Sequence, residues 1–206
     1  MEFKKIQLNG FKSFAEKTNF LIEDGLTGIV GPNGCGKSNI VESLRWVMGE
    51  TSAKSMRGSG MEDVIFSGTS NKASKNIAEV SIEVENKDKE GPIQYRELEQ
   101  IQVRRKIEKD KGSKFYINDK EVRARDAQMF FADLSTGAHS PSMISQGRIG
   151  ALVTAKPTDR RAILEEAAGI SGLHVRRHEA ELRLGAAENN LKRADELRRQ
   201  QEKQLA

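Results

Sequence analysis

The sequence contains a single cysteine, Cys35, among its 206 residues. An internal disulfide is therefore excluded, and the lone thiol suits a reducing compartment. The chain also lacks any apolar run long enough to cross a membrane, and the residues after Met1 alternate between apolar and polar as in a strand, unlike the apolar stretch of a signal peptide. These absences predict a cytoplasmic protein with no membrane partner.

Aromatic and apolar residues are also scarce, at 5% and 36% of the chain, whereas charged residues make up 31%. So few aromatic rings offer no platform on which single-stranded nucleic acid could stack. The high charge predicts a large solvated surface, such as a long exposed helix. Because 34 basic residues are interleaved with 30 acidic ones, the net charge of +4 permits contact with nucleic acid but does not argue for it.

The strongest local signal lies at residues 31–38, which read Gly-Pro-Asn-Gly-Cys-Gly-Lys-Ser and match the pattern G-x-x-x-x-G-K-[ST] at every fixed position. The apolar residues Leu26, Ile29 and Val30 predict a buried strand before this loop, and residues 38–48 predict a helix after it. A strand, a loop and a helix in this order form the context of a phosphate-binding loop. The alternative is a glycine-rich turn that only caps a helix.

Each residue type in this loop suits a polyphosphate. Gly31, Gly34 and Gly36 let backbone N–H groups approach the phosphates and give access to positive φ. The following helix directs its unpaired N–H groups at the same place. Lys37 is expected to bridge the β- and γ-phosphate oxygens, and the hydroxyl of Ser38 suits Mg²⁺. The loop therefore predicts a nucleoside triphosphate with its magnesium ion.

Alternating apolar and polar residues predict the rest of a sheet. Strands are expected at residues 3–8, 18–22, 77–85, 101–107 and 115–117. Residues 77–85 place apolar side chains on one face and polar ones on the other, which is typical of an antiparallel sheet with one solvated face. Arg105 interrupts the apolar face of the fourth strand. The predicted fold is α/β, a mixed sheet lobe around the phosphate-loop strand and its helix.

Helices are predicted for most of the remaining chain. Residues 123–134 carry an apolar stripe with helical spacing, and a second helix is expected to start at Pro157 and Thr158. After Gly172 a long polar helix runs to the end of the sequence, with a thin heptad seam at Ala180, Leu184, Ala187, Leu191, Ala194, Arg198, Gln201 and Leu205. A helix this polar requires a partner from another chain or from sequence that is not present here.

Other catalytic signals are rejected. Asp133 follows an apolar run, as a magnesium-binding acid would, but no glutamate follows it and the run fits a helix better than a strand. Residues 86–89 miss the guanine-recognition pattern by one position, and His174 and His178 lack a general-base glutamate between them. No residue of the chain is placed to activate water, so we assign no catalytic residue.

Six segments, one of which contains the phosphate loop, together resemble the N-terminal head segment of a bacterial chromosome-partition ATPase of the SMC (structural maintenance of chromosomes) family. They are residues 11–14, 31–39, 55–58, 63–68, 137–140 and 144–148, and the resemblance extends through residues 165–170 at the root of a coiled-coil arm. It thus covers the whole chain, which makes it far more specific than the phosphate loop alone.

The resemblance implies an ABC-type P-loop ATPase half-head at residues 1–158 and the root and start of a coiled-coil arm at residues 159–206. It implies ATP and Mg²⁺ as cofactors, with Ser38 and Gln146 at the metal. Arg57, which on local evidence is either a phosphate contact or a residue of a solvated linker, becomes a nucleotide contact. The full set of implied nucleotide-binding residues is Lys12, Ser13, Gly31, Pro32, Asn33, Gly34, Cys35, Gly36, Lys37, Ser38, Asn39, Arg57, Asp63 and Gln146.

The resemblance also implies a function in chromosome condensation and segregation, in which ATP-driven engagement of two heads gates DNA. Members of the family carry the signature motif and the Asp-Glu pair in a C-terminal half, and neither occurs here. The chain alone is therefore expected to be inactive. The implied partners are the C-terminal half of the same head, a second SMC head in a homodimer, a kleisin-type bridging subunit and double-stranded DNA, within the cytoplasm at the nucleoid.

Two other functions remain open from the residues alone. A free-standing P-loop kinase or GTPase would turn over its substrate as an isolated chain. A structural coiled-coil dimer would carry the loop without using it.

Overall fold

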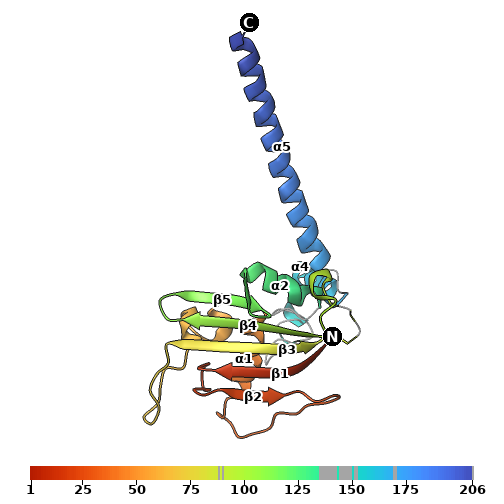
Figure 1. Ribbon diagram of the computed structural model, residues 1–206. Helices are drawn as coiled ribbons and strands as arrows, with labels where there is room; N and C mark the ends of the chain where they lie inside the picture. Colours follow the sequence, from red (N-terminus) through yellow and green to blue (C-terminus); the bar gives the residue numbers. More distant parts are fainter. Residues whose placement is uncertain are drawn as a thin grey trace.

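The computed structural model describes residues 1–87, 89, 91–134, 143, 150, 153–168 and 171–205. Its centre is a six-stranded antiparallel sheet in the order β2-β1-β3-β4-β5-β6 (Figure 1). The strands are β1 (Glu2–Asn9), β2 (Thr18–Leu21), β3 (Ile77–Glu85), β4 (Gln100–Glu108), β5 (Gly112–Ile117) and β6 (Lys120–Val122). Three 3₁₀ helices lie in the connections: η1 (Lys54–Met56), η2 (Met61–Val64) and η3 (Ile93–Tyr95).

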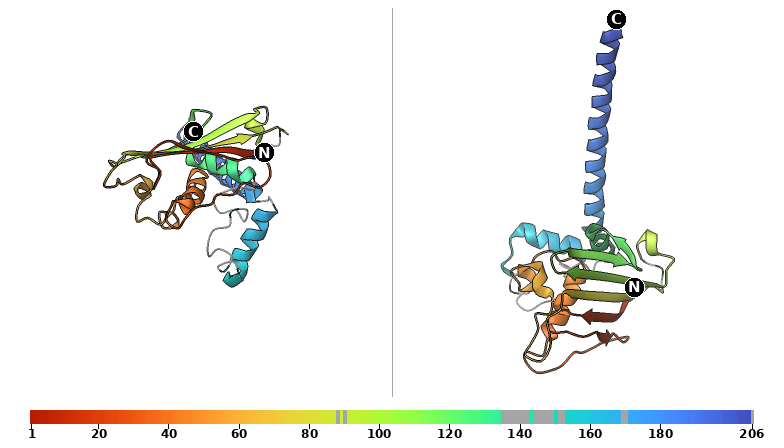
Figure 2. Two further views of the ribbon diagram at one scale, coloured as in Figure 1. Left: turned by 90° about the horizontal axis from the view of Figure 1, so that it is seen from below. Right: turned by 60° about the vertical axis from the view of Figure 1, so that its left-hand side comes forward.

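Helices α1 (Lys37–Val47) and α2 (Ala124–Asp133) lie on the same side of the sheet, as the view from below shows (Figure 2). Each strand places alternate side chains on this side, because successive residues of a strand point to opposite faces. Ile82 and Val103, which pair across β3 and β4, are fully buried there, together with Trp46 of α1 and Phe131 of α2. The other face is polar, with Lys5 donating to Glu83 at 2.8 Å. The predicted one-sided antiparallel sheet is thus confirmed.

Helices α4 (Pro157–Ala167) and α5 (Ser171–Leu205) follow the sheet lobe in the described part of the chain. Helix α4 begins at the predicted proline, and α5 is a single long helix that contacts α2 near its base and then projects away from the sheet (Figure 1). Leu184 and Leu191 of the heptad seam are exposed on it. No helix in the described part of the chain is both long and apolar enough to cross a membrane.

The strand predicted before the phosphate loop is wrong. Residues 26–30 form no strand, and Leu26 and Val30 expose 100% and 94% of their surface. A strand needs hydrogen-bonded neighbours, and the described sheet ends at β2 on one edge and β6 on the other without receiving this segment. The apolar pattern correctly indicates that these side chains need to be buried, but no described residue packs over them. The short strand β6 was not predicted, because three residues carry too little alternation to detect.

Arg105 attaches α1 to the sheet. Its side chain points to the apolar side of β4, where only 3% of the residue is exposed. The guanidinium lies 4.5 Å from the ring centre of Trp46 and 4.6 Å from that of Phe115. It donates to the backbone carbonyls of Trp46 and Glu50, both at 2.7 Å. Burial lowers the pKa of Arg105 to about 10, opposed by the charge of Glu50. The arginine therefore does not interrupt the core, because it binds the end of α1.

We expect a Gly10→Ala substitution to lower the free energy of unfolding by about 2–4 kcal/mol. Gly10 has a φ of +64°, and a Cβ atom there would stand 2.2 Å from the carbonyl oxygen of Ile77. Gly25 has a φ of +88° but open space around it. Gly25→Ala should therefore lower the free energy of unfolding only by the cost of a positive φ for alanine, about 1–2 kcal/mol. Urea unfolding of both variants measures the difference, and equal losses would contradict the predicted clash.

Candidate nucleotide-binding site

The loop at residues 31–36 leads directly into the N-terminus of α1. Gly34 and Gly36 have φ values of +83° and +96°, as predicted, whereas Gly31 does not use a positive φ. A Cβ atom on Gly36 would lie 2.7 Å from the hydroxyl oxygen of Ser13. The backbone N–H groups of Gly36, Lys37 and Ser38 find no acceptor among the described residues. Three free amides at a helix N-terminus make a place for an anion.

Lys37 curls back over this loop. Its ammonium donates to the carbonyl oxygens of Gly31 and Pro32, at 2.5 and 2.7 Å, and lies 3.8 Å from the sulfur of Cys35. The third N–H group of the ammonium has only the long contact with the sulfur, a weak acceptor, so it can turn to a phosphate oxygen. The neighbouring Ser38 is exposed, and its hydroxyl has no hydrogen-bond partner among the residues described. One positive charge and one free hydroxyl thus lie next to the three amides.

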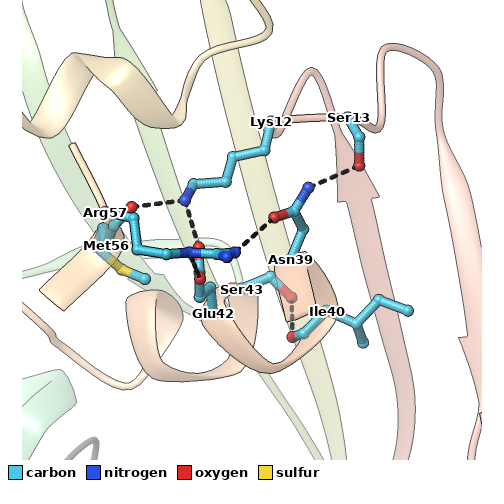
Figure 3. Close-up of polar contacts among 8 residues, drawn as sticks. All are labelled: Lys12, Ser13, Asn39, Ile40, Glu42, Ser43, Met56 and Arg57. Carbon is cyan, nitrogen blue, oxygen red and sulfur yellow. Dashed lines mark hydrogen bonds and ion pairs between the residues drawn. The ribbon is translucent and has the colours of Figure 1, made fainter. Parts of the chain in front are cut away.

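A second group of predicted residues gathers beside the loop from three separate segments (Figure 3). The side-chain amide of Asn39 donates to the hydroxyl of Ser13 at 2.8 Å. The guanidinium of Arg57 donates to the side-chain oxygen of Asn39 at 3.2 Å. Lys12 donates to the backbone carbonyl of Met56 at 2.6 Å. The fold therefore brings together four residues that stand up to 45 positions apart in the chain, Lys12, Ser13, Asn39 and Arg57.

The sequence reasoning missed Glu42, which lies at the centre of this group. Its carboxylate accepts from the ammonium of Lys12 and forms an ion pair with Arg57 (Figure 3). Glu42 follows Asn39 by three positions, so that both side chains lie on one face of α1. That spacing is the only signal the sequence offers, and it is weak because an acidic residue on an amphipathic helix is usually solvated.

Asp63 lies in η2 and caps the turn before it. Its carboxylate accepts from the backbone N–H of Ser59 at 2.6 Å, from the Ser59 hydroxyl at 2.9 Å and from the N–H of Gly60 at 3.0 Å. It also lines an open cleft of about 530 Å³ together with Ile65 and Phe66. The described contacts of Asp63 are therefore with its own turn, and its predicted contact with a nucleotide stays a prediction.

We expect the Asp63 turn to weaken in acid. The N–H of Gly60, followed by the hydroxyl and N–H of Ser59, holds the pKa of Asp63 below its ordinary value of 3.8. A depressed pKa means that the stability this group contributes is present above the unfolded pKa and is lost as the pH falls through the folded one. Melting temperatures measured from about pH 6 to about pH 2.5 should fall less steeply in Asp63→Asn than in the unaltered chain. Parallel curves would contradict this expectation.

Two further residues of the prediction concern metal chemistry. Gln146 lies outside the described residues. A hydroxyl oxygen such as that of Ser38 is a fitting ligand for Mg²⁺, and its exposed position beside the free amides suits a metal that travels with a phosphate. The rejected Asp133 is the last residue of α2, so its assignment to a helix is confirmed.

Comparisons with known proteins show the family to which this chain is related. The family described as RecF/RecN/SMC N terminal domain matches residues 2–148. The chain is similar to the chromosome partition protein Smc of Cereibacter sphaeroides, with 56% identity over 96% of this chain. It covers only 17% of that relative's length, so it corresponds to a part of such a protein.

Two solved structures show the same fold. One is described under the structural biochemistry of ATP-driven dimerization and DNA stimulated activation of SMC ATPases. It matches at a TM-score of 0.72 and 29% identity, covering 81% of this chain and 99% of that one. The other is the Smc head domain of Pyrococcus furiosus with an extended coiled coil, bound to the C-terminal domain of ScpA. It matches at a TM-score of 0.75 and 32% identity, covering 95% of this chain and 48% of that one. The chain therefore belongs to the RecF/RecN/SMC N terminal domain family, as a head segment of the SMC type.

Proposed function

We propose that this chain is the ATP-binding N-terminal half of an SMC-type ATPase head that acts in chromosome condensation and segregation. The observation that carries the proposal is the convergence at the start of α1 of three free amides, the ammonium of Lys37 and the hydroxyl of Ser38. Amides and an ammonium suit the phosphates of ATP. Mg²⁺, held in part by Ser38 and by Gln146, would neutralise charge on the phosphate oxygens when bound.

We expect the same arrangement to bind a triphosphate without hydrolysing it. The carboxylate beside the described site, Glu42, already pairs with two cations, so it is a poor base for activating water. Asp133, the acid that follows an apolar run, ends a helix. Hydrolysis therefore requires an acid from elsewhere, and we assign it to the C-terminal half of the same head, with a second head completing the site.

The exposed apolar segment supports the same partner. Leu26 and Val30 are almost fully exposed immediately before the phosphate loop, although their pattern is that of a buried strand. We propose that strands of the C-terminal half cover them. The proposed boundary between the half-head (1–158) and the arm (159–206) lies within α4, and α5 would continue as one strand of a coiled-coil arm.

The remaining partners are proposed by analogy with two solved relatives. One solved relative is described by ATP-driven dimerization and DNA-stimulated activation, and another is bound to ScpA. We extend these properties to this chain as a homodimeric head, a kleisin-type bridging subunit and double-stranded DNA. In this proposal, ATP drives two heads to engage, and their engagement controls the binding or entrapment of DNA. The protein would act in the cytoplasm, at the nucleoid.

The decisive experiment compares phosphate release by three samples. These are this chain alone, this chain coexpressed with the C-terminal half of the head, and the second sample with double-stranded DNA. We expect no turnover from the first, turnover from the second and faster turnover from the third. Turnover by the chain alone would favour a free-standing kinase or GTPase and would overturn the proposal. Absence of phosphate release from all three samples would favour a purely structural role.

A further inference from the structure

Glu42 is a buried carboxylate in the middle of the candidate site. It lies one turn beyond Ser38 on α1, and only 11% of its side chain is exposed. An acid beside a site for a triphosphate is unexpected, because its charge repels the phosphates. Its presence there therefore calls for a function that outweighs this repulsion.

The contacts of Glu42 indicate such a function. One carboxylate oxygen accepts from Lys12, and the other forms an ion pair with Nε of Arg57 (Figure 3). Lys12 is tied further to the carbonyl of Met56, which directly precedes Arg57 in the chain. The single carboxylate thus joins three segments: the turn after β1, the first turns of α1 and the end of η1.

Both cations are held in an unfavourable backbone conformation. Lys12 has a φ of +46° and Arg57 a φ of +53°, in the left-handed region that residues with a side chain rarely occupy. Such conformations persist only where surrounding contacts hold them in place, and they are enriched at binding sites. The ion pair that Glu42 forms with each side chain is such a contact.

The charges favour a positioning role over a blocking one. Two cations meet one carboxylate, so the group keeps a net positive charge. Arg57 retains 59% exposure of its side chain, while Glu42 lies behind it. The guanidinium also has five N–H groups, and its described contacts occupy Nε and one terminal nitrogen. Arg57 therefore has donors left for an incoming phosphate.

We propose that Glu42 is a positioning residue that holds Arg57 and Lys12 in place for the phosphates of ATP. The inference rests on the proposed nucleotide-binding function and deepens it. It predicts that the carboxylate increases nucleotide affinity, although its own charge opposes the ligand. It also predicts that this effect passes through the two cations.

The test measures the affinity of the full-length protein for a fluorescent ATP analogue with Mg²⁺. Glu42→Gln should weaken binding about tenfold, since the amide retains the shape but loses the charge that orients both cations. In a protein that already carries Arg57→Ala, the same change should weaken binding less than about threefold, because the arginine that Glu42 positions is absent. A purely structural role would give the same factor in both backgrounds and would overturn the proposal.

Controls separate this inference from the function on which it rests. Glu16→Gln, which removes an exposed ion pair with Lys72, should leave the affinity unchanged. Should Lys37→Met bind as well as the unaltered protein, the nucleotide-binding function itself would fail. If Lys37→Met binds the ATP analogue weakly but Glu42→Gln binds it as tightly as the unaltered protein or more tightly, only the role of Glu42 would be overturned.

A second variant covers the case in which Glu42→Gln does not fold, as judged by its circular dichroism. Glu42→Asp keeps the charge but is one methylene shorter, so it cannot reach both cations at once. We expect it to bind the ATP analogue about threefold more weakly than the unaltered protein. Affinity equal to that of the unaltered protein would overturn the proposal.

Discussion

Replacing Arg105 with alanine is expected to lower the free energy of unfolding by about 3–5 kcal/mol. The substitution removes the guanidinium that donates to the carbonyls of Trp46 and Glu50, although the N–H of Gly49 still donates to the Trp46 carbonyl at 3.2 Å. It also opens a cavity between two aromatic rings. Urea unfolding followed by the fluorescence of Trp46, the only tryptophan of the chain, measures the loss. Arg105→Lys should recover little of it, because an ammonium does not stack as a planar guanidinium does.

The neighbouring arginine provides the control. Arg104 lies on the opposite, solvated face of β4, where it donates to Asp119 at 2.8 Å and lies over the ring of Tyr116. Such partly exposed contacts contribute little, so Arg104→Ala should cost about 0–1 kcal/mol. A similar loss for the two variants would show that burial of Arg105 does not attach α1 to the sheet.

Replacing Lys37 with methionine is expected to lower the affinity of the full-length protein for ATP by at least about 100-fold. The ammonium carries the positive charge at the phosphate loop, and its described contacts are with the carbonyls of that loop and the nearby sulfur of Cys35. The melting temperature without nucleotide should therefore stay close to that of the unaltered protein. Calorimetric titration with ATP and Mg²⁺ measures the effect.

Lys72→Met is the matched control for this experiment. Lys72 is an exposed lysine that pairs with Glu16, so its loss removes the same charge from the protein without touching the loop. We expect it to bind ATP as the unaltered protein does. If Lys37→Met retained affinity within about threefold, the assignment of the loop as a phosphate site would be wrong.

The strands show where prediction from sequence works best. Residues 78–85 alternate strictly between apolar and polar, because one face of an antiparallel sheet is buried and the other is wet. They form β3 with the expected bounds, Ile77–Glu85. Helix α1 was equally predictable, since the loop pattern marks its start and Gly49 its end, with a φ of +105°. In both cases the information lies within a few neighbouring residues.

Charged residues in the interior show where such prediction fails. Arg105 appears in the sequence only as a break in an apolar face, and Glu42 as an ordinary polar residue of a helix. Each is buried because its partner comes from far along the chain: Trp46 for Arg105, and Lys12 and Arg57 for Glu42. No local pattern records such a pairing.

The sequence by itself determined the phosphate loop, most strands and helices, and the family resemblance, because periodicity and short motifs depend on neighbours in the chain. Only the tertiary structure decided that the described residues leave 26–30 exposed, that Arg105 attaches α1 to the sheet and that Glu42 pairs with two cations. Burial of a charge and pairing of a strand both depend on partners distant in sequence, and folding alone brings those partners together.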